Sequence, residues 1–189
     1  MNFIVEDETF KNINFKENFL KKGDYENCTF LDCSFLNADV TSVNFFECNF
    51  INCDLSSAII TNTTFKEVSF NDCKMVGLQF EKCNEVFFSA TFNKSILSYS
   101  SFYNRVLKNV TFNHCNLTEV DFSSADISKL KFDNCNCKDA IFNQTIMEQT
   151  DFRTSYNFTI HPEKNRINKA KFTKENVSGL LANYNILIE

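Results

Sequence analysis

The chain is poor in residues that interrupt regular structure and in residues that build common active sites. Its 189 residues include 3 glycines, 1 proline and 2 histidines. So little glycine and proline excludes a disordered, collagen-like or turn-rich sandwich protein. Three glycines cannot build a glycine-rich phosphate loop, and the sequence places no nucleophile beside His114 or His161. We therefore expect neither enzyme activity nor a bound cofactor.

A basic leader and a long apolar run are also missing. The first ten residues, MNFIVEDETF, carry acids where a secretion signal would carry basic residues, and no apolar run long enough to span a membrane follows. We expect a cytoplasmic protein without a membrane partner. Its 9 cysteines, an odd number, are then expected to be free thiols in a reducing compartment.

The chain does have a sequence period of five. Every fifth residue is apolar from Phe10 to Phe80 and, after a shift of two residues, from Phe87 to Phe152. These runs contain 29 central positions, of which 17 are Phe, and the residue two places before the centre is small in 22 of them. The period matches neither the 3.6 residues of a helix nor the two of an ordinary strand. The chain should therefore turn every five residues, with one large and one small side chain pointing inward each time.

Four such turns close a square of twenty residues, and successive coils should lie about 4.8 Å apart, the usual inter-strand distance. Side chains twenty residues apart then stack. The clearest predicted column consists of Phe10, Phe30, Phe50, Phe70, Phe92, Phe112, Phe132 and Phe152. The period thus predicts an all-β solenoid of about seven coils.

We divide the chain into a β-helix over residues 1–172 and a C-terminal helix and tail over 173–189. The register breaks near 81–86, where two extra residues form either a bulge or a kink that offers a contact point. The last coil, 153–172, is expected to be looser. Thr173 can N-cap the helix, which would cover that coil. One apolar face of the helix, which could also bury against a second copy, consists of Val177, Leu180, Leu181 and Tyr184.

The cysteines occupy the interior of the predicted coil. Eight of them fall at the small inward position and Cys137 at a central one. Structural zinc sites favour two cysteines separated by two to four residues, whereas Cys28 and Cys33 are five apart, on adjacent walls. Free cysteine is commonly buried as a small apolar residue. We predict core thiols and no metal site.

The charge is unevenly spread along the chain. Residues 1–86 carry a net charge of −7, residues 87–152 carry −1, and residues 153–189 carry +3. The acidic majority opposes direct nucleic-acid binding and permits a basic partner. Two outward columns hold Asp32 with Asp72 and Glu47 with Glu67. They form either a solvated face or a regularly spaced row of negative charge on a rod of DNA-like width.

The repeating unit, [Ala/Cys/Ser/Thr/Val]-[Asp/Asn]-[Phe/Leu]-x-x, resembles that of the pentapeptide-repeat proteins over roughly residues 8–172. The resemblance implies a right-handed quadrilateral β-helix. The cysteine-rich start NCTFLDCSF, the single break between two runs and the terminal helix are most similar to the Qnr-type quinolone-resistance members.

That resemblance implies a homodimer through the C-terminal helix that mimics DNA and binds DNA gyrase and topoisomerase IV. The implied phosphate mimics are Asp32, Glu47, Glu67 and Asp72, and the implied dimer seam is Val177, Leu180, Leu181 and Tyr184. A structural rod with another protein partner is the alternative. A metal-binding thiol protein is the third possibility.

Overall fold

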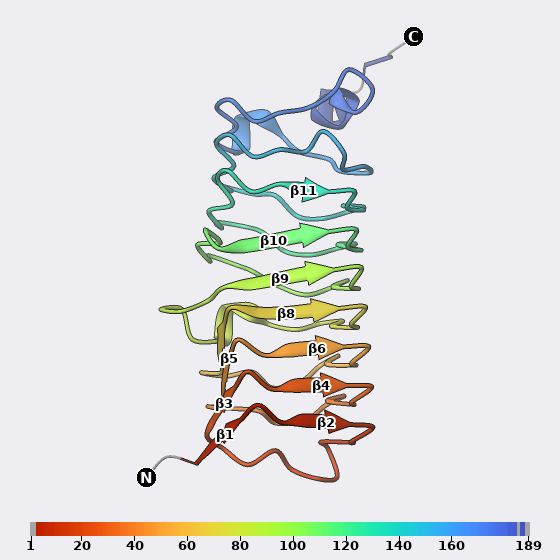
Figure 1. Cartoon of the computed structure of the whole chain (residues 1–189). Helices are drawn as coiled ribbons and strands as arrows, with labels where there is room; N and C mark the ends of the chain where they lie inside the picture. Colours follow the sequence, from red (N-terminus) through yellow and green to blue (C-terminus); the bar gives the residue numbers. More distant parts are fainter. Residues whose placement is uncertain (1–2, 185, 188–189) are drawn as a thin grey trace.

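The chain folds into a rod of parallel strands wound around an aromatic interior (Figure 1). The computed structural model describes residues 3–184, 186 and 187. One wall is a four-stranded sheet of order β1-β3-β5-β7, and another is a seven-stranded sheet of order β11-β10-β9-β8-β6-β4-β2. Isolated parallel bridges such as Asn116 to Asn136 and Asp121 to Ile141 build the other two walls. The prediction of a right-handed quadrilateral β-solenoid is confirmed.

All the regular elements are short, because the chain turns again after each five-residue unit. In chain order they are β1 (Ile4–Glu6), β2 (Thr9–Lys11), β3 (Asp24–Glu26), β4 (Thr29–Leu31), β5 (Asn44–Phe46), β6 (Asn49–Ile51), β7 (Thr64–Lys66), β8 (Val68–Asn71), η1 (Phe80–Lys82), β9 (Ala90–Asn93), β10 (Val110–Asn113), β11 (Phe132–Asp133), η2 (Pro162–Lys164), η3 (Val177–Leu180) and η4 (Ala182–Tyr184), where η marks a 3₁₀ turn. In the described part of the chain, no helix is long and apolar enough to cross a bilayer.

The predicted phenylalanine column is the centre of the rod. Its rings stack with centroid separations between 4.7 and 5.6 Å, and Phe172 extends the column by one ring. Rings of the middle of the column, such as Phe50 and Phe112, are fully buried. Each such burial stabilises the fold by about 1.5–3 kcal/mol. We number the levels of the rod by this column, from level 1 at Phe10 to level 9 at Phe172.

The corners of the coil require an uncommon backbone conformation. Among the described residues, 25 that are not glycine lie in the left-handed region of φ, mostly at five-residue intervals. This region costs an L-residue about 1–2 kcal/mol, and asparagine and aspartate enter it most easily after glycine. These two types account for 12 of the 25. The abundance of asparagine in a chain with only 3 glycines follows from this geometry.

The register break is a bulge of one wall. β8 and β9 pair in register across it, with Phe70 opposite Phe92, so the seven-stranded sheet is not kinked. The extra residues form the loop that projects between β8 and β9 in Figure 1. The expectation that Phe87 resumes the inward series is wrong: Phe87 is 53% exposed and Phe88 is buried. The residue at which the inward series resumes after a two-residue insertion depends on the conformation of the inserted loop, which the five-residue spacing does not determine.

The C-terminal segment forms the two 3₁₀ turns η3 and η4 rather than the α-helix expected there. The expectation that Thr173 is the N-cap is wrong: Asn176 holds the N-cap position of η3, and the Thr173 Oγ1 accepts a hydrogen bond from the Asn176 N–H at 3.3 Å in the turn before it. The Asn176 side chain donates to the Phe152 carbonyl, and the Ile160 N–H donates to the Gly179 carbonyl. A Cβ on Gly179 would lie 2.4 Å from the Phe158 carbonyl oxygen. These close contacts with the last coil bend the segment away from a regular helix.

Candidate partner-binding site

The four candidate carboxylates lie at corners that flank a single wall. We call the turn that enters the seven-stranded sheet the leading corner and the turn that leaves it the trailing corner. Glu47 and Glu67 occupy the leading corner, and Asp32 and Asp72 occupy the trailing one. All four are exposed, with φ between 54° and 56°. The fold therefore brings them to the two edges of the lower half of the same wall.

Each row of carboxylates rises with the levels of the rod. Glu47 and Glu67 are on successive levels, about 4.8 Å apart, while Asp32 and Asp72 are two levels apart, about 10 Å. Between the two aspartates, the Asn52 amide donates a hydrogen bond to Asp32 Oδ1 at 2.7 Å. The left-handed corner explains an aspartate but gives no preference for glutamate. The corner conformation therefore does not account for Glu47 and Glu67.

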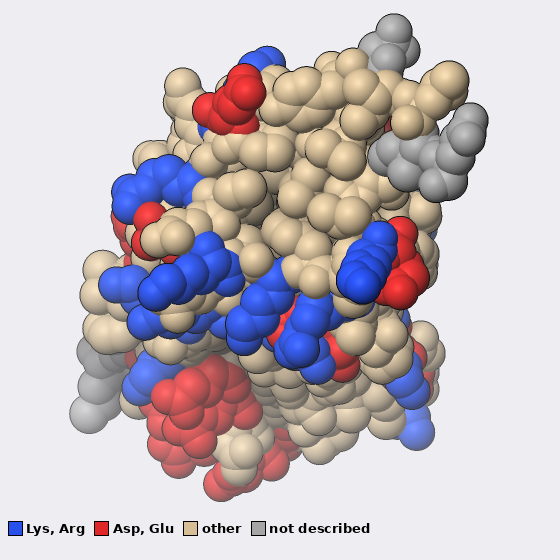
Figure 2. Space-filling model, turned by 90° about the horizontal axis from the view of Figure 1, so that it is seen from above, with Lys and Arg blue, Asp and Glu red and all other residues tan. Residues whose placement is uncertain are grey.

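The leading corner changes its charge from one end of the rod to the other. Figure 2 looks down the rod from its C-terminal end and shows lysine and arginine side chains near the viewer, with a cluster of acidic side chains deeper on one side. From level 1 to level 9 the leading corner reads Asp7, Asn27, Glu47, Glu67, Ser89, Asn109, Lys129, Gln149 and Lys169. The negative residues end at level 4, and the positive residues begin at level 7.

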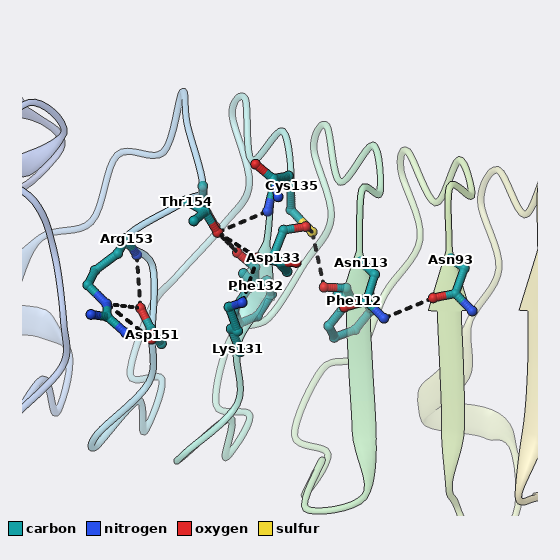
Figure 3. A network of polar contacts seen from close by, with 12 residues as sticks. Asn93, Phe112, Asn113, Lys131, Phe132, Asp133, Cys135, Asp151, Arg153 and Thr154 are labelled. Carbon is teal, nitrogen blue, oxygen red and sulfur yellow. Dashed lines mark hydrogen bonds and ion pairs between the residues drawn. The ribbon is translucent and has the colours of Figure 1, made fainter.

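The upper part of the seven-stranded wall neutralises its own charges (Figure 3). Lys131 Nζ lies 2.7 Å from Asp133 Oδ1, and the Arg153 guanidinium lies 2.8 Å from Asp151 Oδ2. The hydrogen bond from Arg153 holds the pKa of Asp151 below its usual range. Within the described part of the chain, the ion pairs include neither Lys129 nor Lys169. The cationic half of the leading corner is thus free to meet an external charge.

The cysteines serve as hydrogen-bond donors within the core. The Cys48 thiol donates to the Tyr25 carbonyl at 3.2 Å, twenty-three residues earlier, and Cys53 donates to the Phe30 carbonyl at the same distance. The hydroxyls of Thr63 and Thr145 make the same bond in other coils. Cysteine here does what threonine does in other coils: it fits a small inward position and donates to a carbonyl.

These thiols are not arranged for reactivity or metal binding. All nine are free and buried. Burial raises the pKa of Cys48 and of Cys137 to about 12, so neither supplies a thiolate near neutral pH. Among the described residues, no group of three His, Cys, Asp or Glu side chains could hold a metal ion. His114 is exposed on the trailing corner, far along the chain from His161, whose ring lies 6.1 Å from that of Tyr184.

One functional candidate is missing from the sequence-based set. Arg105 stands at a small inward position one level above the break and is only 4% exposed. Its guanidinium donates to the carbonyls of Cys83 at 3.3 Å and Asn84 at 3.1 Å, and lies 5.2 Å from the centroid of the Phe88 ring. It thereby fixes the projecting loop, on which Val86 is 77% exposed. A charged residue at an inward position beside a register break was the signal that could have identified it.

The expected seam residues do not share one exposed face. Leu180 packs against the core, and Leu181 is half-buried. Val177 and Tyr184 are exposed, as are Ile186 and Leu187 beyond them. The outward apolar surface at this end is therefore displaced toward the chain end.

The family model for pentapeptide repeats matches residues 48–84, 87–123 and 121–155, with 8 copies of the repeat. The chain belongs to the pentapeptide-repeat family. These matches cover more than half of the chain and include parts of the runs on both sides of the break. Among curated proteins, none matches the sequence.

One solved structure has the same fold at low sequence identity, and a second matches less well. A trypsin-treated variant of QnrB1, a plasmid-mediated fluoroquinolone resistance protein, matches with a TM-score of 0.63 and 19% identity, over 100% of each chain. HetL, a pentapeptide-repeat protein of the cyanobacterium Nostoc involved in heterocyst differentiation regulation, matches with a TM-score of 0.47 and 11% identity. That match covers 90% of this chain and 87% of HetL.

Proposed function

We propose that this protein is a non-enzymatic DNA mimic that binds a type II topoisomerase, either DNA gyrase or topoisomerase IV, and modulates it or protects it from quinolones. The observation that carries the proposal is the pair of exposed carboxylate rows at the two edges of one wall. We place the protein in the cytoplasm, where nine free thiols would persist.

The chemistry of this wall suits a surface that binds phosphates. Duplex DNA presents two rows of negative charge, and proteins that bind it present lysine and arginine to those rows. Residues 1–86, which build the lower half, carry a net charge of −7. A basic cleft would attract this half at long range and then meet Glu47, Glu67, Asp32 and Asp72 at level-by-level spacing.

The fold likeness supports the choice of partner. QnrB1 is named as a fluoroquinolone resistance protein and aligns with this chain over its whole length. Proteins that share a fold at 19% identity can differ in function, so the proposal rests on the carboxylate rows.

We also propose a homodimer through the C-terminus. Val177 and Tyr184 are exposed at the end of the rod, next to Ile186 and Leu187. Replacing Val177 and Tyr184 with aspartate should then give monomers by light scattering. Leu180→Asp is the poorer test, since Leu180 packs against the core and its loss would disturb the fold itself.

The test is gyrase supercoiling with and without ciprofloxacin. Micromolar protein should inhibit supercoiling or restore it in the presence of the drug. The variant D32N/E47Q/E67Q/D72N removes the charge of the rows while keeping side-chain size, and should lose this effect. The matched control E119Q/D139N changes two exposed corners of the same left-handed conformation elsewhere on the rod, and should retain it. No effect of the unmodified protein would refute the proposal.

A scaffold for another protein partner is the second candidate, and the projecting break loop favours it. Val86 and Phe87 are exposed on a loop that Arg105 holds in place. A pull-down that enriches another protein and lacks topoisomerase subunits would support this function. If V86S/F87S abolished that enrichment, the loop would be identified as the contact.

A further inference from the structure

The charges along the leading corner are complementary to those of a second leading corner that runs in the opposite direction. Level 5, at Ser89, is the midpoint between Asp7 at level 1 and Lys169 at level 9. Asp7, Glu47 and Glu67 lie below the midpoint, and Lys129 and Lys169 lie above it. The remaining positions are neutral.

We propose that a second copy of this chain binds along this corner in the antiparallel sense, with a twofold axis at level 5. Reversal brings Asp7 to Lys169 of the second copy and Glu47 to Lys129 of the second copy. The neutral residues Asn27 and Gln149 face each other, and Glu67, the one charged corner residue without an opposite charge, faces the amide of Asn109. In this register no like charges face each other across the corner. Because a twofold interface repeats each contact, it contains four ion pairs.

The backbone supports the register that this pairing needs. Seven of the nine corner residues have φ between 51° and 66°, so their side chains leave the rod from one conformation. The seven are Asp7, Asn27, Glu47, Glu67, Lys129, Gln149 and Lys169. The two exceptions, Ser89 and Asn109, directly follow the break, where β8 and β9 still pair in register and the extra residues project as a loop.

The same loop supplies apolar surface close to the axis. It ends at Ser89 and exposes Val86 and Phe87, and Val106 is exposed on the next level. An interface with an apolar centre and charged ends has the usual anatomy of a protein contact. At a twofold axis each residue lies next to the same residue of the second copy. Apolar side chains can pack in this way, whereas two identical charges would repel each other.

This contact is distinct from the C-terminal seam. It covers Glu47 and Glu67, which the proposed function assigns to the topoisomerase, so a copy bound along the corner and a bound topoisomerase exclude each other. It is long and narrow, and its ends are exposed ion pairs, which salt screens over about 10 Å at 0.1 M. We therefore expect an association that is present at low salt and lost as salt rises. The apolar C-terminal contact should persist under the same conditions.

Disulfide trapping tests the register. N27C/Q149C should form a cross-linked dimer on mild oxidation, since the two positions meet between copies. Within one chain they are six levels, about 29 Å, apart and cannot bridge. N27C/N109C is the matched control, because reversal does not bring those positions together. The nine native cysteines are buried and do not compete. A monomeric N27C/Q149C protein, or equal cross-linking of the control, would overturn the proposal.

A charge swap tests the chemistry. D7K/E47K makes the corner mostly basic, and K129E/K169E makes it acidic. Each variant alone should associate about tenfold more weakly than the unmodified protein at low salt, and an equimolar mixture should restore association. Analytical ultracentrifugation at low and high salt measures both. Unchanged self-association of the two variants, or a mixture no stronger than its components, would contradict the pairing.

Discussion

Levels 1 to 4 and levels 6 to 9 of the rod share an aromatic column and left-handed corners but differ in what those corners carry. The column rings stack in both halves, 4.7 Å apart for Phe30 and Phe50 and 5.2 Å apart for Phe112 and Phe132. The leading corner nevertheless holds Glu47 and Glu67 below and Lys129 and Lys169 above. The inward positions thus maintain the fold, while the corners can change charge without disturbing it. Function in this rod is expected at the corners.

The largest effect should come from the interior, and it should be equal in the two halves. Phe50 and Phe132 are fully buried and each stacks on a ring above and below. Replacing either with alanine should cost about 3–5 kcal/mol of unfolding free energy, measured by urea denaturation. Phe10→Ala is the control: Phe10 lies at the partly exposed end of the same column, so its replacement should lower the unfolding free energy by less. A large difference between Phe50→Ala and Phe132→Ala would show that the halves are not built alike.

Arg105→Ala should have the next largest effect, because it acts at the boundary between the halves. The change leaves two loop carbonyls without a donor and opens a cavity beside Phe88. We expect a loss of about 2–4 kcal/mol, with Arg105→Lys intermediate because lysine lacks the planar fork. Increased proteolysis within 83–89 would locate the change. Stability equal to that of the unmodified protein would remove Arg105 from this role.

Alkaline pH should destabilise the rod, and the lower half contains six of the nine cysteines. Burial raises the thiol pKa from near 8.5 in the unfolded chain to about 12 at Cys48, Cys83 and Cys137. The folded state therefore favours the protonated thiol. This stabilisation is complete below pH of about 8.5 and is lost progressively as the pH rises toward 12.

The urea concentration at the unfolding midpoint, measured in reductant, should thus be lower at pH 10.5 than at pH 7.5. In the variant C28S/C48S/C53S, where serine can keep the hydrogen bond, the fall should be smaller. Identical midpoints at the two pH values would show that thiol ionisation does not limit stability.

The smallest effect should come from relieving the corners themselves. Asparagine tolerates the left-handed region better than glutamate or lysine. Glu47→Asn places it in the acidic part of the leading corner, and Lys129→Asn places it in the basic part. Each should stabilise the fold by roughly 0.5 kcal/mol, because the corner cost falls. Thermal unfolding measures the change. Destabilisation by either variant would mean that its charge contributes to the fold as well.

The period of five was sufficient to predict the coil, the phenylalanine column and the inward cysteines. Each of these follows from which residues recur, and the interior has room for only one large and one small side chain per unit. The period did not predict that Phe88 rather than Phe87 is buried, because several loop conformations can accommodate the two-residue insertion. The 3₁₀ turns at Val177 and Ala182 depend on contacts of Asn176 and Gly179 with the last coil, which local patterns do not encode.

The sequence pattern predicts the acidic corners, and the same spacing also contains the positive residues that continue the leading corner. Lys129 and Lys169 occupy the same phase of the repeat as Glu47 and Glu67. The signal was therefore present in the spacing alone.

The most direct test of the account compares the affinity of three proteins for DNA gyrase at one low salt concentration. They are the unmodified chain, the lower-corner variant D32N/E47Q/E67Q/D72N and the upper-corner variant K129Q/K169Q. The account predicts that the lower-corner variant binds at least about tenfold more weakly, while the upper-corner variant binds as well as the unmodified chain. Equal affinity of all three, or an equal loss in both variants, would contradict the claim that the acidic corners of the lower half carry the function.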